Sequence, residues 1–124
     1  MAETFLQTIP ILRMFDVAKA KEFYVDFLGF AIDWEHRFEP ELPLYMQISR
    51  GNLVLHLSEH YGDGTPGSAV FVRMGGVDEY HRELAAKRYN YYRPGVQTTP
   101  WGSRCMDVKD PFGNRLSFDE KQEI

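Results

Sequence analysis

The segment DPFGNRLSF, residues 110–118, joins a turn to an alternating strand and is the clearest local signal of the fold. Its proline presets φ for one central position of a turn, and its glycine and asparagine both tolerate positive φ. Leu116 and Phe118 then alternate with more polar residues, which is the period of a strand with one buried face. The segment therefore predicts a turn followed by a strand that shows Ser117 on its less apolar side.

Two helical patterns stand out in the rest of the chain. Residues 17–28 and residues 77–87 both place apolar side chains at spacings of three and four, which is typical of a helix with one buried face. Asp16 is suited to be the N-cap of the first helix and Gly29 to be the residue that ends it.

Strand-like runs surround these helices in a repeated order. One run precedes each helix and three runs follow it. Around the first helix the runs are 8–14 before it and 31–38, 44–49 and 53–58 after it. Around the second helix they are 69–74 before it and a tyrosine-rich run near 89–93, 104–108 and 115–118 after it. The order β-α-β-β-β therefore occurs twice. We expect one α+β domain over residues 1–124, with modules at about 5–60 and 66–122 that form a curved mixed sheet with a concave groove.

Composition excludes several classes of protein. The net charge of −4 argues against nucleic acid as the main partner, because phosphate binding needs a basic face. The chain has one cysteine, no apolar run long enough to span a membrane, and no basic region at its start typical of a signal peptide. We expect a cytoplasmic protein that interacts with neither nucleic acid nor membrane.

Three segments resemble one superfamily. They are RMFDVAKAKEFYVDFLGF (13–30), GGVDEYHREL (75–84) and PWGSRCMDVKDPFGNRLSF (100–118). With the doubled element order, they resemble the vicinal-oxygen-chelate superfamily, which contains glyoxalase I, extradiol dioxygenases, fosfomycin-resistance enzymes and bleomycin-resistance proteins. The resemblance implies the glyoxalase/bleomycin-resistance fold.

The metal-ligand positions of that superfamily carry mostly unsuitable residues here. By resemblance, three of the four positions correspond to Ile9, Ala69 and Ser117, and the fourth lies at or beside His56. A stable divalent site needs three or four converging donors, and this set offers one. The resemblance thus implies no metal, no cofactor and no catalytic residue.

Among the metal-free branches, the chain is most similar to bleomycin-resistance proteins in length, in its Pro100-Trp101-Gly102 turn and in its aromatic residues at concave positions. This similarity implies a homodimer that sequesters a cationic glycopeptide drug in two grooves at the subunit interface. Exchange of the N-terminal strand between the chains is common in such dimers, and no catalysis is implied.

The predicted ligand-binding residues come from strand alternation and from this resemblance: Trp101, Phe71, Phe38, Tyr45, His56, Gln47 and Ser117. Several have a purely structural alternative. Trp101 could cap the edge of the core, Phe71 could lie in a dimer interface, Phe38 could pack within its loop, and His56 could be a hydrogen-bonded structural residue. Cys105 is expected to be an inert buried thiol.

The leading hypothesis is therefore a metal-free, dimeric protein that binds bleomycin-type antibiotics. One alternative is a glyoxalase- or isomerase-like enzyme of the same fold, with His56 as a base or as part of an incomplete metal site. Another alternative is a binding protein for an unrelated metabolite. The sequence leaves these alternatives open, because the groove also depends on the loops at 37–45 and 59–67.

Overall fold

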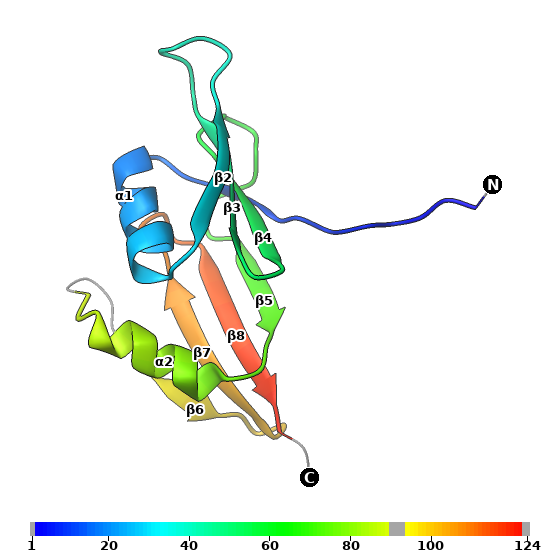
Figure 1. Ribbon diagram of the computed structural model, residues 1–124, viewed down its shortest axis with the longest axis vertical. Coiled ribbons are helices and arrows are strands. Elements are labelled where there is room, and N and C mark those ends of the chain that lie inside the picture. Colours follow the sequence, from blue (N-terminus) through cyan, green and yellow to red (C-terminus); the bar gives the residue numbers. More distant parts are fainter. Residues whose placement is uncertain (1, 90–93, 123–124) are drawn as a thin grey trace.

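The computed structural model describes residues 2–89 and 94–122, which fold into two similarly built modules (Figure 1). The first module contains β1 (Ile11–Arg13), α1 (Val17–Lys21) with its continuation η1 (Glu22–Phe27), β2 (Ala31–His36), β3 (Tyr45–Arg50) and β4 (Leu53–Ser58). The second module contains β5 (Ala69–Arg73), α2 (Val77–Ala86), β6 (Val96–Thr98), β7 (Ser103–Lys109) and β8 (Arg115–Lys121). The predicted α+β class and the doubled β-α-β-β-β order are confirmed.

Each module forms a mixed sheet with the same topology. The strand orders are β1-β4-β3-β2 and β5-β8-β7-β6. In each sheet the first strand runs parallel to the last, and the other neighbours are antiparallel. Within the described part of the chain, no strand of one sheet is hydrogen-bonded to a strand of the other. Each module therefore has its own sheet, with one face toward the core and one face away from it.

The first helix begins and ends at the predicted residues but is not α-helical throughout. The carboxylate of Asp16 accepts a hydrogen bond from the backbone N–H of Lys19 at 3.0 Å, which caps the helix. Residues Glu22–Phe27 then form a π-helical stretch. Gly29 ends the helix at φ +84°, where an added Cβ would also collide with the Arg50 guanidinium.

None of the helices in residues 2–89 and 94–122 is long and apolar enough to cross a membrane.

The turn at residues 110–114 joins the two modules. Asp110 is 6% exposed, and its Oδ1 accepts from the backbone N–H groups of Phe112 and Asn114, both at 2.8 Å. Its Oδ2 accepts from the Tyr24 hydroxyl at 2.7 Å and from Asn114 Nδ2 at 2.8 Å. Asn114 Nδ2 also donates to the carbonyl of Arg13 at 2.9 Å. The turn therefore connects β8 to the helix and to the first strand of the other module.

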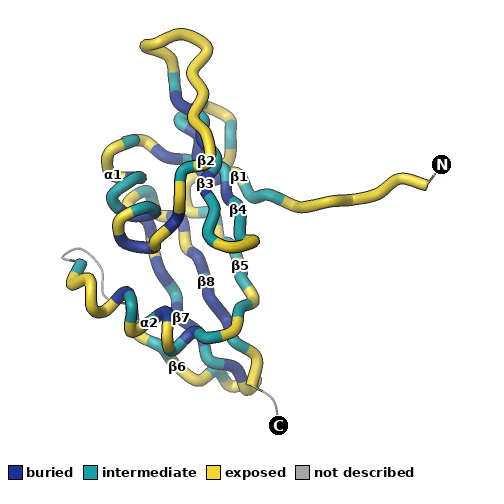
Figure 2. The backbone as a smooth tube through the Cα atoms, viewed as in Figure 1, coloured by how far each residue is buried: buried dark blue, intermediate teal, exposed yellow. Residues whose placement is uncertain are grey.

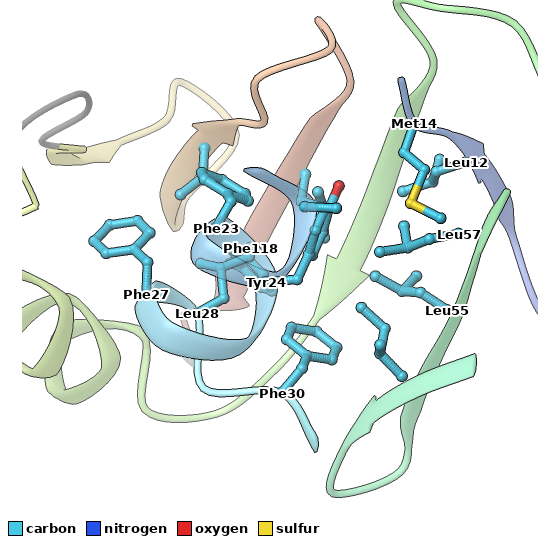
Figure 3. Close-up of a cluster of buried hydrophobic side chains, with 14 of the residues drawn as sticks. Leu12, Met14, Phe23, Tyr24, Phe27, Leu28, Phe30, Leu55, Leu57 and Phe118 are labelled. Atoms are coloured by element: carbon cyan, nitrogen blue, oxygen red, sulfur yellow. The ribbon is translucent and has the colours of Figure 1, made fainter. Parts of the chain in front are cut away.

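The hydrophobic core lies between the two sheets and takes side chains from both modules (Figure 3). Strand alternation predicts that Leu12, Met46, Leu55, Val72 and Phe118 face the helices. Four of them are at most 2% exposed, and Val72 is partly buried against the same core. Figure 3 shows side chains of the first helix, including Phe23 and Leu28, in one cluster with Phe118 and the leucines of β1 and β4. The predicted phase of these strands is confirmed. The residues that alternate with the buried ones therefore lie on the faces of the sheets that point away from the core.

One expected strand falls mostly outside the described residues. The run near 89–93 is predicted to be a strand, and residues 90–93 of it are not described; the strand that the structure describes after α2 is β6, which begins at Val96. Tyr89, the described residue of this run, stacks on Phe27, with ring centroids 4.6 Å apart.

The N-terminal segment extends away from both modules. β1 begins at Ile11 rather than at residue 8, and residues 2–8 form an exposed arm (Figures 1 and 2). Phe5 is 89% exposed and Leu6 is 91% exposed on this arm. Two adjacent large apolar side chains are thus left without cover in the single chain.

Candidate functional site

The face of the first sheet that points away from the core, here called the first open face, carries three of the predicted site residues. Tyr45 and Gln47 on β3 and His56 on β4 all lie on it, and Gln47 is directly opposite His56. Ile48 and Leu55, which alternate with them, are fully buried on the other side. Strand period therefore brings these three polar and aromatic groups together.

A β-bulge in β2 adds two further residues to this face. Ile32 pairs with Ile48, but Trp34 rather than Asp33 pairs with Gln47, so one residue is inserted between them. Such a bulge changes the direction of the side chains that follow it. Asp33 and Trp34 are consequently both on the first open face, where Asp33 Oδ2 accepts from Gln47 Nε2 at 3.0 Å.

A hydrogen-bonded chain crosses the first open face. The Tyr45 hydroxyl lies 2.6 Å from His56 Nδ1, and His56 Nε2 lies 2.9 Å from Gln47 Oε1. The Asp33 carboxylate can only accept hydrogen bonds, so the Gln47 amide must turn its nitrogen toward Asp33. The oxygen of the same amide then faces His56. The proton of the neutral imidazole is therefore on Nε2, and Nδ1 accepts from Tyr45.

His56 is consequently a structural member of this chain of hydrogen bonds. Desolvation by burial lowers the pKa of His56, which favours the neutral ring that the hydrogen bonds require. Both ring nitrogens are occupied by Tyr45 and Gln47, so neither offers a free lone pair to a metal or to a substrate proton. The arrangement holds the Tyr45 ring in place.

Beside this chain of hydrogen bonds lies a pocket of about 510 Å³, here called the first-sheet pocket. Its lining residues are mostly aromatic rings: Trp34, His36, Phe38, Tyr45, His60 and Asp63. Trp34 and Tyr45 are stacked, with ring centroids 5.9 Å apart and planes at 12°. A pocket of this size can hold part of a drug-sized molecule.

The predicted residue Phe38 belongs to the first-sheet pocket. Its ring meets His36 edge-on at 4.7 Å and His60 at 6.1 Å, yet the residue is 72% exposed. Asp63 lies in the loop after β4, and its Oδ2 accepts from the Ser58 hydroxyl at 2.9 Å. The loops on both sides of β3 and β4 therefore complete the pocket that the strands begin.

The predicted residues Phe71 and Ser117 lie together on the open face of the second sheet. They are directly opposite each other in the β5–β8 ladder, and Phe71 is 56% exposed. The Ser117 hydroxyl donates to Asp107 Oδ1 on β7 at 2.6 Å. Arg73 lies over the Phe71 ring at 5.4 Å and contacts Asp119 Oδ2 at 3.3 Å. This second open face is thus more charged than the first.

Trp101 projects from the turn between β6 and β7. The backbone bonds from Thr99 N to Ser103 O at 2.8 Å and from Gly102 N to Thr99 O at 3.1 Å close this turn. Trp101 is 73% exposed. Its ring does not cap the core in this chain and is free to contact a ligand or another chain.

The predicted site residues therefore fall into separate groups within one chain. Tyr45, Gln47, His56 and Phe38 belong to the first sheet and its pocket, whereas Phe71 and Ser117 belong to the second sheet and Trp101 to a turn beside it. Sequence reasoning missed Trp34, His36 and Asp63 as pocket residues and Asp107 as the partner of Ser117. The alternation of Trp34 and His36 was a usable signal for those two.

The residues at the superfamily's metal-ligand positions do not fit a divalent ion. Ile9 and Ala69 have no donor atom in their side chains, Ser117 is bonded to Asp107, and His56 has both nitrogens engaged. Over residues 2–89 and 94–122, no three His, Cys, Asp or Glu side chains gather as a metal site would require. The absence of a bound metal stays a prediction.

Cys105 lies on the second sheet and is 8% exposed. Burial, followed by the charges of Asp107 and Asp119, raises the pKa of its thiol. A raised pKa reduces the fraction of reactive thiolate at neutral pH. This supports the expectation of an inert thiol.

Comparison with known proteins shows the family. A family model described as glyoxalase superfamily protein matches residues 2–124. No curated protein matches the sequence.

Several solved structures share the fold. A bleomycin-binding protein solved in complex with bleomycin has a TM-score of 0.73 and 23% identity, over 95% of this chain and 100% of that chain. A bleomycin-binding protein from Streptomyces verticillus, in complex with copper(II)-bleomycin, has a TM-score of 0.70 and 28% identity, over 98% and 100%. A bleomycin resistance determinant encoded on the transposon Tn5 has a TM-score of 0.72 and 21% identity, over 96% and 100%. The family match over nearly the whole length and the two-module fold show that the chain belongs to the glyoxalase superfamily.

Proposed function

We propose that this protein is a metal-free, dimeric binding protein that sequesters bleomycin-type glycopeptide antibiotics in the cytoplasm. The solved structures of similar fold whose descriptions name bleomycin support the class of ligand. The exposed aromatic side chains on both open faces support binding as the mode of action. In this proposal residues 1–124 form one domain of two modules, at about 5–60 and 66–122.

The observation that carries the proposal is the number of exposed aromatic side chains away from the core. Phe38 is 72%, Phe71 56% and Trp101 73% exposed, and the Trp34–Tyr45 stack borders an open pocket. Exposed apolar side chains mark ligand or protein interfaces when they gather into one patch, as these would in the proposed dimer. Flat aromatic faces suit stacking on a planar part of a ligand, at about 1 kcal/mol per pair beyond the burial of area.

A second copy of the chain would combine the two groups of site residues. The first-sheet pocket and the pair formed by Phe71 and Ser117 belong to different sheets of one chain. A two-fold dimer is the commonest closed assembly. In the proposed dimer, the first open face of one copy meets the second open face of the other, and the exposed Phe5 and Leu6 pack on the partner as an exchanged N-terminal segment.

The enzymatic alternative has less support. A general base needs a free lone pair within reach of a substrate proton. His56 uses both ring nitrogens in hydrogen bonds to Tyr45 and Gln47. The remaining alternative is a binding protein for an unrelated metabolite, and a direct titration distinguishes it from the proposal.

The test is a titration with metal-free bleomycin, followed by the fluorescence of the two tryptophans. We expect saturable quenching, because the drug would stack close to Trp101 and Trp34. Trp101→Ala should weaken binding by about 1–3 kcal/mol, as is usual for an aromatic anchor. Phe71→Ala should also weaken binding, with sedimentation as a control for loss of the dimer. Absence of quenching up to millimolar drug would refute the drug assignment.

A further inference from the structure

The first-sheet pocket combines aromatic walls with one uncompensated carboxylate. None of its lining residues is a lysine or an arginine. Asp63 Oδ2 accepts from the Ser58 hydroxyl at 2.9 Å, while Oδ1 has no donor and the carboxylate no ion-pair partner within residues 2–89 and 94–122. A negative charge without a cation therefore borders a largely apolar space.

The charge of Asp63 acts on the aromatic wall of this pocket. Burial, and after it the charge of Asp63, raises the pKa of Tyr45, so the carboxylate acts on the aromatic wall itself. The faces of Trp and Tyr rings carry the negative end of their quadrupole. The neighbouring Arg37 is occupied, because it donates to the carbonyl of Leu42 at 2.7 Å and pairs with Glu59 at 3.9 Å.

The walls are also held in position. The Trp34–Tyr45 stack is fixed on one side by the hydrogen bond from Tyr45 to His56, and Trp34 meets the His56 ring edge-on at 5.4 Å. Phe38 forms another wall, between His36 and His60. Fixed aromatic faces lose little conformational entropy when a ligand binds between them.

We propose that the first-sheet pocket binds the quaternary-ammonium-like head of an organic cation, with Trp34, Tyr45 and Phe38 as its walls and Asp63 as its counter-ion. A large, weakly hydrated cation is favoured over a metal ion, because it gains from aromatic faces and needs only one carboxylate. This inference rests on the proposed function and deepens it by naming the chemical group that the pocket of each chain recognises.

The test compares two probes of the same shape and different charge. Choline carries a quaternary nitrogen, and 3,3-dimethyl-1-butanol carries a neutral carbon in its place. Both are titrated into the Trp101→Phe variant, in which Trp34 is the remaining tryptophan and reports on the pocket. The titration is done at pH 8, above the ordinary titration range of histidine. We expect half-saturation with choline at a concentration at least about tenfold lower than with the alcohol.

Matched variants separate the pocket from the general charge of the protein. Asp63→Asn keeps an acceptor for Ser58 but removes the charge, and Phe38→Leu removes one wall; each should weaken choline binding at least about fivefold. Glu41→Gln removes an exposed acid from the loop that contains Phe38, and Tyr61→Leu removes an aromatic that is 97% exposed in the loop that contains Asp63. Both of these controls should leave choline binding unchanged.

Equal responses to choline and to the neutral alcohol would overturn the inference, as would an Asp63→Asn variant that binds choline like its parent. The outcome is separate from that of the bleomycin titration. Bleomycin binding without choline selectivity would refute only the assignment of this pocket. Selective choline binding without bleomycin binding would support the pocket and refute the drug assignment.

Discussion

At the scale of single residues, Tyr24 and Asp110 show how a polar group can be buried in this core. Tyr24 is fully buried, and its hydroxyl donates to an Asp110 carboxylate that also receives two backbone N–H groups. Burial is the main reason why the pKa of Tyr24 lies well above its usual range, and Asp110 raises it further. The phenol therefore stays protonated and remains a donor at all ordinary pH values.

Removing this donor should destabilise the fold. Tyr24→Phe keeps the ring but leaves the buried Asp110 carboxylate short of one hydrogen bond, so we expect a loss of about 1–3 kcal/mol in the free energy of unfolding. Urea denaturation followed by circular dichroism measures it. Tyr61→Phe, at a position 97% exposed, is the control and should change stability little. Equal stability of the two variants would show that the Tyr24 hydroxyl contributes nothing.

At the scale of elements, β3 and α2 are joined across the modules by an ion pair. Arg50, at the end of β3, donates to both carboxylate oxygens of Glu83 on α2, at 2.7 and 2.9 Å. Arg50 also donates to the carbonyl oxygen of Leu28 at 2.7 Å. The same oxygen accepts a second hydrogen bond from the Tyr80 hydroxyl at 2.6 Å. Arg50, Tyr80 and Glu83 also line a second cavity, of about 440 Å³, between the modules.

This ion pair predicts a change of stability with pH. The hydrogen bonds from Arg50 are the main reason why the pKa of Glu83 lies below its usual value of 4.5. A carboxyl group whose pKa is lower in the folded state stabilises the fold above the unfolded pKa, and this stabilisation is lost as pH falls through the folded pKa. Both side chains are over one-third exposed, so we expect at most about 1 kcal/mol.

The measurement is urea denaturation at neutral pH and at pH 3. Glu83→Gln should make the loss of stability on acidification smaller than in the parent protein. Glu41→Gln, in an exposed loop, should leave the pH dependence as it is. An unchanged pH dependence in Glu83→Gln would contradict a role of the ion pair in acid sensitivity.

At the scale of the whole molecule, the single chain leaves two surfaces uncovered. One is the pair of open faces, which carry exposed aromatic side chains such as Trp34 and Phe71. The other is the arm of residues 2–8, which Figure 2 colours as exposed and which carries Phe5 and Leu6. Exposed apolar surface that is contiguous favours association. The proposed dimer covers both surfaces with the same contact.

Sedimentation tests this assembly. The intact protein should sediment at micromolar concentration as a species of about twice 14.5 kDa. Deletion of residues 1–8 should shift the equilibrium toward the monomer, because it removes Phe5 and Leu6 from the interface. Phe5→Ser with Leu6→Ser should act in the same direction without shortening the chain. A monomeric intact protein would refute the dimer, and an unaltered dimer after deletion would refute only the role of the arm.

The sequence by itself determined the α+β class, the doubled element order, the caps of the first helix and the phase of the strands, because each follows from local period and turn chemistry. Tertiary structure decided which side chains meet. The bulge at Asp33 and the hydrogen bonds of His56 depend on register between strands, and Asp63 reaches the pocket through a loop. The separation of Phe71 from the first-sheet pocket depends on how the two sheets pack. Contacts between segments far apart in the chain leave no local pattern in the sequence, so only the folded chain shows them.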